Sequence, residues 1–132
     1  ILDSLNGSIK HKRNFSSKFK LLINNGNIFL ITNNNFLISM KLNDGKIIYS
    51  YDLNQKVANF IDTKKKNLQI KNLFLVNNKI FVFLKNSYII KIRLDGEIDE
   101  IIRLPSKINS DPIFIDNYLM YLNKKNKLIV LN

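Results

Sequence analysis

The chain of 132 residues contains no cysteine, no tryptophan and a single histidine. Without cysteine it has no disulfide framework, no thiolate metal site and no cysteine nucleophile. Its four glycines form no phosphate-binding loop or nucleophile elbow. No apolar run approaches the roughly 20 residues of a membrane-spanning helix. The sequence therefore carries no recognisable catalytic, metal-binding or cofactor-binding motif, and we expect a protein that is not an enzyme.

Arginine is also scarce, although the formal net charge is +11. The chain has 18 lysines and 3 arginines, beside 21 asparagines and 21 isoleucines, a bias that an AT-rich coding sequence would impose on any fold. Recognition of bases and phosphates favours the planar fork of arginine. We therefore expect a basic, solvated surface and no nucleic-acid partner.

The sequence contains an internal repeat. From Leu21 it reads LLINNGNIFLITNNNFLISMKLNDGKIIYSYDL, and from Leu73 it reads LFLVNNKIFVFLKNSYIIKIRLDGEIDEIIRL. Each copy has four apolar runs separated by three polar turns, the last of which contains Asp-Gly. From Pro112 the chain has a copy with three runs, and residues 1–15 hold only the third and fourth runs.

Alternating apolar and polar residues indicate that the runs are β-strands. Phe36, Ile38, Met40 and Leu42 would share one face of a strand, with Ser39 and Lys41 on the other, which is a period of two and not 3.6. The same pattern recurs in 88–94. The runs 27–32 and 79–84 are apolar on both faces and should be inner strands.

Asp-Gly and Asn-Gly pairs predict the turns before the fourth runs. Asp95-Gly96 and Asn6-Gly7 are signals of two-residue hairpins, because both residues tolerate the positive φ that such turns require. The copy Asn43-Asp44-Gly45 has one residue more, which predicts a longer turn or a β-bulge.

Units of four antiparallel strands joined by short links are typical of a β-propeller. The sequence thus predicts an all-β partial propeller of about three blades, expected to be a fragment because the smallest rings have about four blades. The fourth strand of the last blade would come from the amino-terminal strand of a complete ring. The predicted parts are the end of a blade (1–15), a blade (19–53), an insertion (54–69), a blade (70–104) and an incomplete last blade (112–132).

The copies FLISMKLNDGKIIYSYDL and YIIKIRLDGEIDEI resemble the repeat of quinoprotein-type (PQQ-like) propellers, in which an alternating strand ends in Asp-Gly. The order of the last blades is similar to the carboxy-terminal half of the BamB family, the propeller lipoproteins of outer-membrane protein assembly. Members usually have a tryptophan just after the turn glycine. Here Tyr49 is the nearest substitute, and Ile9 and Ile98 occupy the comparable places.

The resemblance implies a non-catalytic scaffold in the periplasm that contacts the barrel-inserting subunit of the outer-membrane assembly machinery. Peripheral membrane association would then come from an amino-terminal region absent from this sequence. The alternative is a ligand-binding or catalytic PQQ-like propeller whose active site lies in absent blades. A third interpretation is an adhesive or nucleic-acid-binding surface built from the lysines, with a steep salt dependence. Quinone enzymes need a calcium site and an aromatic platform, and neither pattern is present.

Two groups of titratable residues are candidates for a catalytic or metal-binding site. His11 lies among basic residues of a predicted outer strand, which favours a solvated histidine over a catalytic one. The carboxylates of Asp95, Glu97, Asp99 and Glu100 surround one hairpin. Asp95 is explained by the turn, and Lys91 and Arg93 can balance the others, so no catalytic pair is predicted.

The insertion is the best clue to a partner. Turn glycines are 38 residues apart from Gly7 to Gly45 but 51 apart from Gly45 to Gly96, so 13 extra residues lie between two blades, within 54–69. Insertions between repeats sit on one rim, where binding loops are tolerated. A floppy lysine-rich loop is one interpretation. The other is a contact patch in which apolar residues lie beside charge, made of Phe60, Ile61, Lys64, Lys65 and Lys66.

Overall fold

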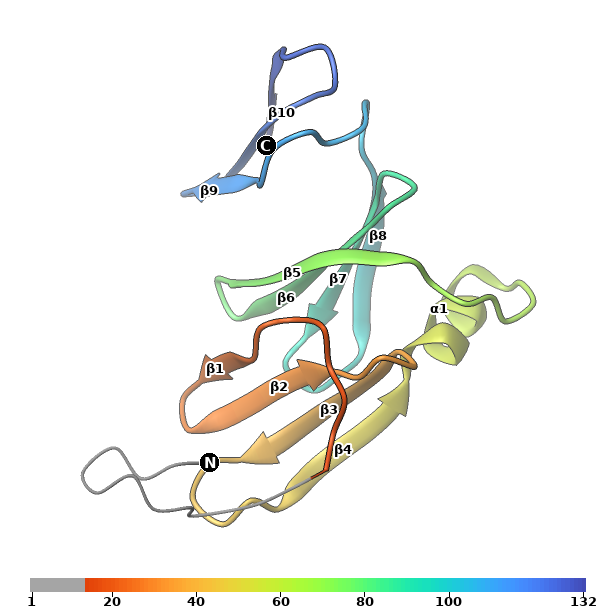
Figure 1. Ribbon diagram of the computed structural model, residues 1–132, viewed down its shortest axis with the longest axis vertical. Helices are drawn as coiled ribbons and strands as arrows, with labels where there is room; N and C mark the ends of the chain where they lie inside the picture. The colour runs from red at the N-terminus through yellow and green to blue at the C-terminus, as the bar shows by residue number, and fades with distance from the viewer. Residues whose placement is uncertain (1–13) are drawn as a thin grey trace. The chain divides into compact units, whose positions relative to one another are not determined.

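The computed structural model describes residues 14–132. Predictions that involve the preceding residues, including the first partial blade, the Asn6-Gly7 turn, Ile9 and His11, lie outside the described part. The chain divides into two compact units, one up to Leu68 and one from Gln69 to Asn132. In each sheet, strands that are consecutive in the sequence are hydrogen-bonded neighbours (Figure 1).

Unit 1 contains a four-stranded antiparallel sheet, a helix and a loop. The sheet order is β1-β2-β3-β4, with strands β1 Leu22–Asn24, β2 Asn27–Ile31, β3 Phe36–Lys41 and β4 Ile47–Asp52. Helix α1, Leu53–Ile61, continues directly from β4 (Figure 1). The predicted inner strand 27–32 is β2, the second strand of the sheet.

Unit 2 contains a four-stranded and a three-stranded sheet, both antiparallel. The first has the order β5-β6-β7-β8, with β5 Ile70–Val76, β6 Lys79–Leu84, β7 Tyr88–Arg93 and β8 Ile98–Arg103. The second has the order β11-β10-β9, with β9 Ile113–Ile115, β10 Tyr118–Leu122 and β11 Leu128–Leu131. Within the described residues, β11 pairs only with β10.

Asparagine explains how the first hairpin of each four-stranded sheet turns. Asn25 and Gly26 join β1 to β2, and both have positive φ (47° and 77°). Asn77 and Asn78 do the same between β5 and β6, with φ of 50° and 60°. Asparagine tolerates the left-handed region better than most residues, so these pairs form the tight turns whose twist matches the strands.

The two Asp-Gly turns differ from each other. The Arg93 N–H donates to Glu97 O (2.9 Å), so the loop around Asp95-Gly96 has three residues, and the predicted two-residue hairpin is wrong. Gly96, with φ of 88°, occupies the left-handed position of such a loop. In the other copy Lys41 N–H donates to Lys46 O (2.9 Å), which gives the predicted longer turn.

The two inner strands of unit 1, β2 and β3, are buried on both faces. Ile28, Leu30, Ile38 and Met40 form a cluster on one face, with Phe36 and Leu42 packed against it. Ser39 lies on the opposite face, as the alternation predicts, but it is only 1% exposed. Period two assigns a residue to a face and does not show whether that face is covered.

Aromatic side chains join the two sheets of unit 2. The Phe114 ring of β9 lies 5.8 Å from the Phe74 ring, 5.1 Å from Phe81 and 6.2 Å from Phe83. Tyr121 of β10 is 2% exposed in the same cluster. Tilted and edge-on ring pairs at these separations add to the burial of apolar area. Unit 2 is therefore held together by a core between its two sheets.

Candidate functional site

The segment that interrupts the repeat begins with a capped helix. Asp52 accepts a hydrogen bond from the Gln55 N–H (3.3 Å) at the start of α1. Asp62, with φ of 56°, ends the helix in the left-handed conformation, and Thr63 N–H donates to Ala58 O. The interpretation of the segment 54–69 as a floppy loop is thus wrong for residues 54–61, which are helical. The signal that sequence reasoning missed is an Asp cap before apolar residues at helical spacing.

One side of α1 is buried against its own sheet. Leu53, Val57 and Ala58 are 0%, 8% and 3% exposed, and α1 contacts β3 and β4. Phe60 and Ile61, at the end of the helix, are 49% and 50% exposed. Burial of the inner face fixes α1 on the sheet, so these two apolar side chains are presented to solvent on an ordered element.

A network of asparagine amides anchors the loop that follows the helix. The Asn35 side chain donates to Asn54 Oδ1 (3.0 Å), Asn67 Oδ1 (3.2 Å) and Leu68 O (2.9 Å). Asn54 Oδ1 also accepts from Leu68 N–H (3.0 Å). Asn35 and Asn54 are buried, at 6% and 8% exposed. Buried polar groups are costly unless they are paired, so this network fixes both ends of the segment.

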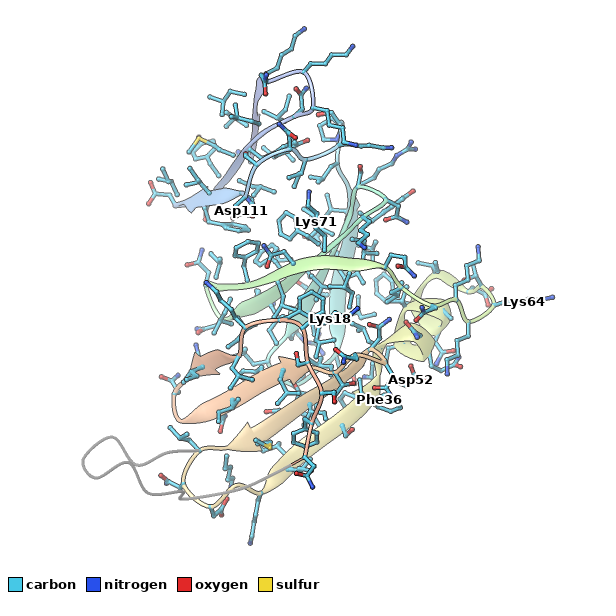
Figure 2. The ribbon with its side chains drawn as sticks, viewed as in Figure 1. Lys18, Phe36, Asp52, Lys64, Lys71 and Asp111 are labelled. Carbon is cyan, nitrogen blue, oxygen red and sulfur yellow. The ribbon has the colours of Figure 1, made fainter. Side chains whose placement is uncertain are left out.

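The three lysines of the loop have different surroundings. The Lys65 ammonium forms an ion pair with Asp52 at the start of α1. The hydrogen bond from Lys65 and the one from the Gln55 N–H hold the pKa of the Asp52 carboxyl below its ordinary value. Lys64 and Lys66 are exposed, and Figure 2 shows Lys64 extending away from the loop. In the predicted contact patch, Lys65 is therefore held by its ion pair with Asp52, whereas Lys64 and Lys66 lie on the surface.

A second cation lies at the start of α1. The Lys56 ammonium is 3.8 Å from the centre of the Tyr51 ring, and Tyr51 stacks on Tyr49 with 4.8 Å between ring centres. Cation–π contacts of this kind hold a lysine over an aromatic face. Tyr49, the predicted substitute for the family tryptophan, therefore belongs to a small stack on β4.

The acidic hairpin of unit 2 is occupied by ion pairs. Asp95 accepts from Glu97 N–H (2.9 Å) and pairs with Arg93 (3.3 Å). Glu100 pairs with Lys91 at 3.2 Å, and Asp99 lies 3.4 Å from Lys79. Lys91 and Arg93 balance these acids as expected, and Lys79 is a further partner. Within residues 14–132 no group of three or more His, Cys, Asp or Glu side chains is placed to hold a metal ion.

Comparisons with known proteins show the fold. No family model and no curated protein matches the chain. Among solved structures, BamB from Moraxella catarrhalis matches with a TM-score of 0.62 and 13% identity over 88% of this chain and 31% of BamB. The WD40 domain of SCAP from fission yeast matches with a TM-score of 0.53 and 12% identity, over 84% of this chain and 28% of that one.

Quinohemoprotein alcohol dehydrogenase from Comamonas testosteroni matches with a TM-score of 0.51 and 11% identity, over 83% of this chain and 17% of the enzyme. The chain spans about a third of the length of BamB, 31%. In the described residues, no helix is long and apolar enough to cross a membrane. The predicted partial β-propeller of four-stranded blades is confirmed, and in fold the chain resembles BamB and the quinoprotein propellers.

Proposed function

We propose that the chain is part of a non-catalytic propeller scaffold that binds protein, of the BamB type that takes part in outer-membrane protein assembly in the periplasm. The observation that carries the proposal is the inserted helix and loop. Phe60 and Ile61 are half exposed on an element held by a buried amide network, beside the exposed Lys64 and Lys66.

Protein contacts favour this combination of features. Half-exposed apolar side chains supply area that a partner can bury, and surrounding charges select the partner and speed its approach. Anchoring by Asn35 and Asn54 reduces the conformational entropy that the segment would lose on binding. The fold likeness to BamB suggests the barrel-inserting subunit of the assembly machinery as that partner.

The test uses the full-length protein and the purified barrel-inserting subunit, with binding measured by biolayer interferometry at moderate salt. We expect saturable binding, and a loss of at least tenfold in affinity on replacing Phe60 and Ile61 with serine, because two apolar anchors of this size are lost. The matched control is Ile47→Ser with Ile48→Ser, since these β4 residues are 44% and 46% exposed in the same unit.

Each result bears on a different part of the proposal. Binding that is lost in the Phe60 and Ile61 variant and kept in the control supports both the scaffold function and the contact patch. Equal losses in both variants would place the contact elsewhere. No binding of the subunit would contradict the scaffold function.

A further inference from the structure

Unit 2 contains a cavity of about 270 Å³ between its two sheets. All of its lining residues follow the inserted helix in the sequence. Its lining comes from the start of β5, the β6–β7 turn, the 104–112 linker and the β10–β11 turn. These segments lie at one end of the strands and are mostly connecting loops, which often carry binding residues. Figure 2 labels Lys71 and Asp111, which both line it.

Lysines dominate the rim of this cavity. Lys71, Lys85, Lys107 and Lys124 line it, each from a different segment, whereas Asp111 is the single acidic residue in its lining. The Asn72 side chain lies within 3.5 Å of Asp111 Oδ1 as a donor. Four lysines against one aspartate give the lining a net positive charge, which would attract an anion.

The base of the cavity is apolar. Phe83 and Leu104 are 2% and 4% exposed and belong to the core between the two sheets. Ile108 and Pro112 add partly buried apolar surface to the lining. Pockets for small molecules are mostly apolar with a few polar groups that fix the orientation of the ligand. The cavity has that composition, with cationic groups at its rim.

The 104–112 linker forms one wall of the cavity, and hydrogen bonds hold it on both sides. Leu104 N–H donates to Ser87 O (2.8 Å), and the Lys71 ammonium donates to Ile108 O (3.2 Å). On the other side, the Tyr121 hydroxyl donates to Ser106 O (3.0 Å). Tyr121 is only 2% exposed. The wall is therefore fixed to both sheets, and a ligand would enter a site that already has its shape.

We infer that this cavity binds a small anion that carries a phosphate or carboxylate group on a compact apolar body. The anionic group would lie among the lysines and the apolar body over Phe83 and Leu104. Lysine binds such groups as a point charge without the directional fork of arginine, so both kinds of anion fit. This site is independent of the proposed protein contact, because it uses residues of unit 2 alone.

The experiment titrates phenyl phosphate, benzoate and inorganic phosphate into the 132-residue chain by isothermal calorimetry. We expect saturable binding of phenyl phosphate or benzoate, and binding of inorganic phosphate at least tenfold weaker, because it lacks the apolar body. The comparison of phenyl phosphate with benzoate shows which anionic group the site prefers. Binding should weaken steeply as salt is raised, since the attraction is screened.

The variant that tests the site is Lys85→Gln with Lys107→Gln, which should weaken binding by about tenfold or more as two charge-assisted contacts are lost. Lys71 is left in place because it also supports the linker. The control is Lys125→Gln with Lys127→Gln, which removes the same charge from exposed lysines outside the cavity and should change affinity less than twofold.

Circular dichroism establishes that each variant is folded, and the single variant Lys107→Gln replaces the double variant if the latter does not fold. Three outcomes would overturn the inference. They are the absence of saturable binding of any probe, equal affinity for phenyl phosphate and inorganic phosphate, and equal weakening in the cavity variant and its control.

Discussion

The side-chain amide of Asn35 donates a hydrogen bond to Asn54 Oδ1 over 3.0 Å, although the two residues are 19 positions apart. Asn35 lies in the β2–β3 turn with φ of 65°, and its carbonyl accepts from the Leu53 N–H at 2.9 Å. One turn residue thus contacts the first two residues of the helix and, through Leu68 O, the end of the loop. The position of the inserted segment depends on this residue pair.

Replacing Asn54 with alanine should lower the free energy of unfolding of unit 1 by about 1–3 kcal/mol, the usual cost of leaving buried groups unsatisfied. The Leu68 N–H would lose its acceptor, and Asn35 would lose one of its three. Urea denaturation measures the change. Asn59→Ala is the control, because Asn59 is exposed on the same helix, and it should shift stability by less than about 0.5 kcal/mol.

The repeat predicted the strands because each strand is encoded locally. Alternating apolar residues and asparagine turns recur at fixed places in the copies, so sheet formation needs no knowledge of distant contacts. The turn at Gly96 shows the limit of this local encoding. The glycine lies in the turn as predicted, but Arg93 and Glu97 close the hairpin. That choice of closing residues depends on how β7 and β8 align. Register is a property of two strands together.

The candidate site was less predictable for the same reason. Phe60 and Ile61 could be singled out because apolar residues beside lysines are unusual in a loop, and both are half exposed. Asn35 and Asn54 could not, because asparagine is abundant in this chain and nothing local distinguishes the buried ones. Likewise, the lysines around the unit 2 cavity are far apart in sequence and meet only in the folded unit.

The lowered pKa of Asp52 predicts a pH dependence. A carboxyl whose pKa is depressed in the folded state stabilises that state above its ordinary pKa of 3.8, and this contribution is lost as pH falls through the folded pKa. Asp52→Asn should therefore lower stability at pH 7 by at most about 1 kcal/mol, since Lys65 is half exposed. Asparagine still caps the helix, so the two proteins should converge at about pH 2. A difference that persists at pH 2 would mean that the ion pair is not its cause.

The hydroxyl of Tyr121 should stabilise unit 2 through the linker. Tyr121→Phe removes the hydrogen bond to Ser106 O and leaves that carbonyl without this donor. We expect a loss of about 1–2 kcal/mol, measured by thermal or urea unfolding. Tyr118→Phe, at a residue that is 47% exposed on the same strand, should have little effect. Equal effects of the two changes would show that the buried hydroxyl contributes nothing specific.

The exposed lysines of the inserted loop should control how fast a partner associates. In the proposed complex, Lys64→Glu with Lys66→Glu should lower the association rate constant for the barrel-inserting subunit several-fold at low salt, because charges at the rim of an interface steer encounter. The effect should shrink as salt rises and screens the charges.

Lys18→Glu with Lys20→Glu is the matched control for this change, since these lysines are exposed in the same unit with the same spacing. It alters net charge equally, so it isolates position from total charge. A similar slowing in both variants would assign the effect to the overall positive charge of +11. A slowing that is restricted to the loop variant, and that persists at about 0.1 M salt, would place the encounter at the Phe60 and Ile61 surface, because charges act over only about 10 Å at that salt concentration.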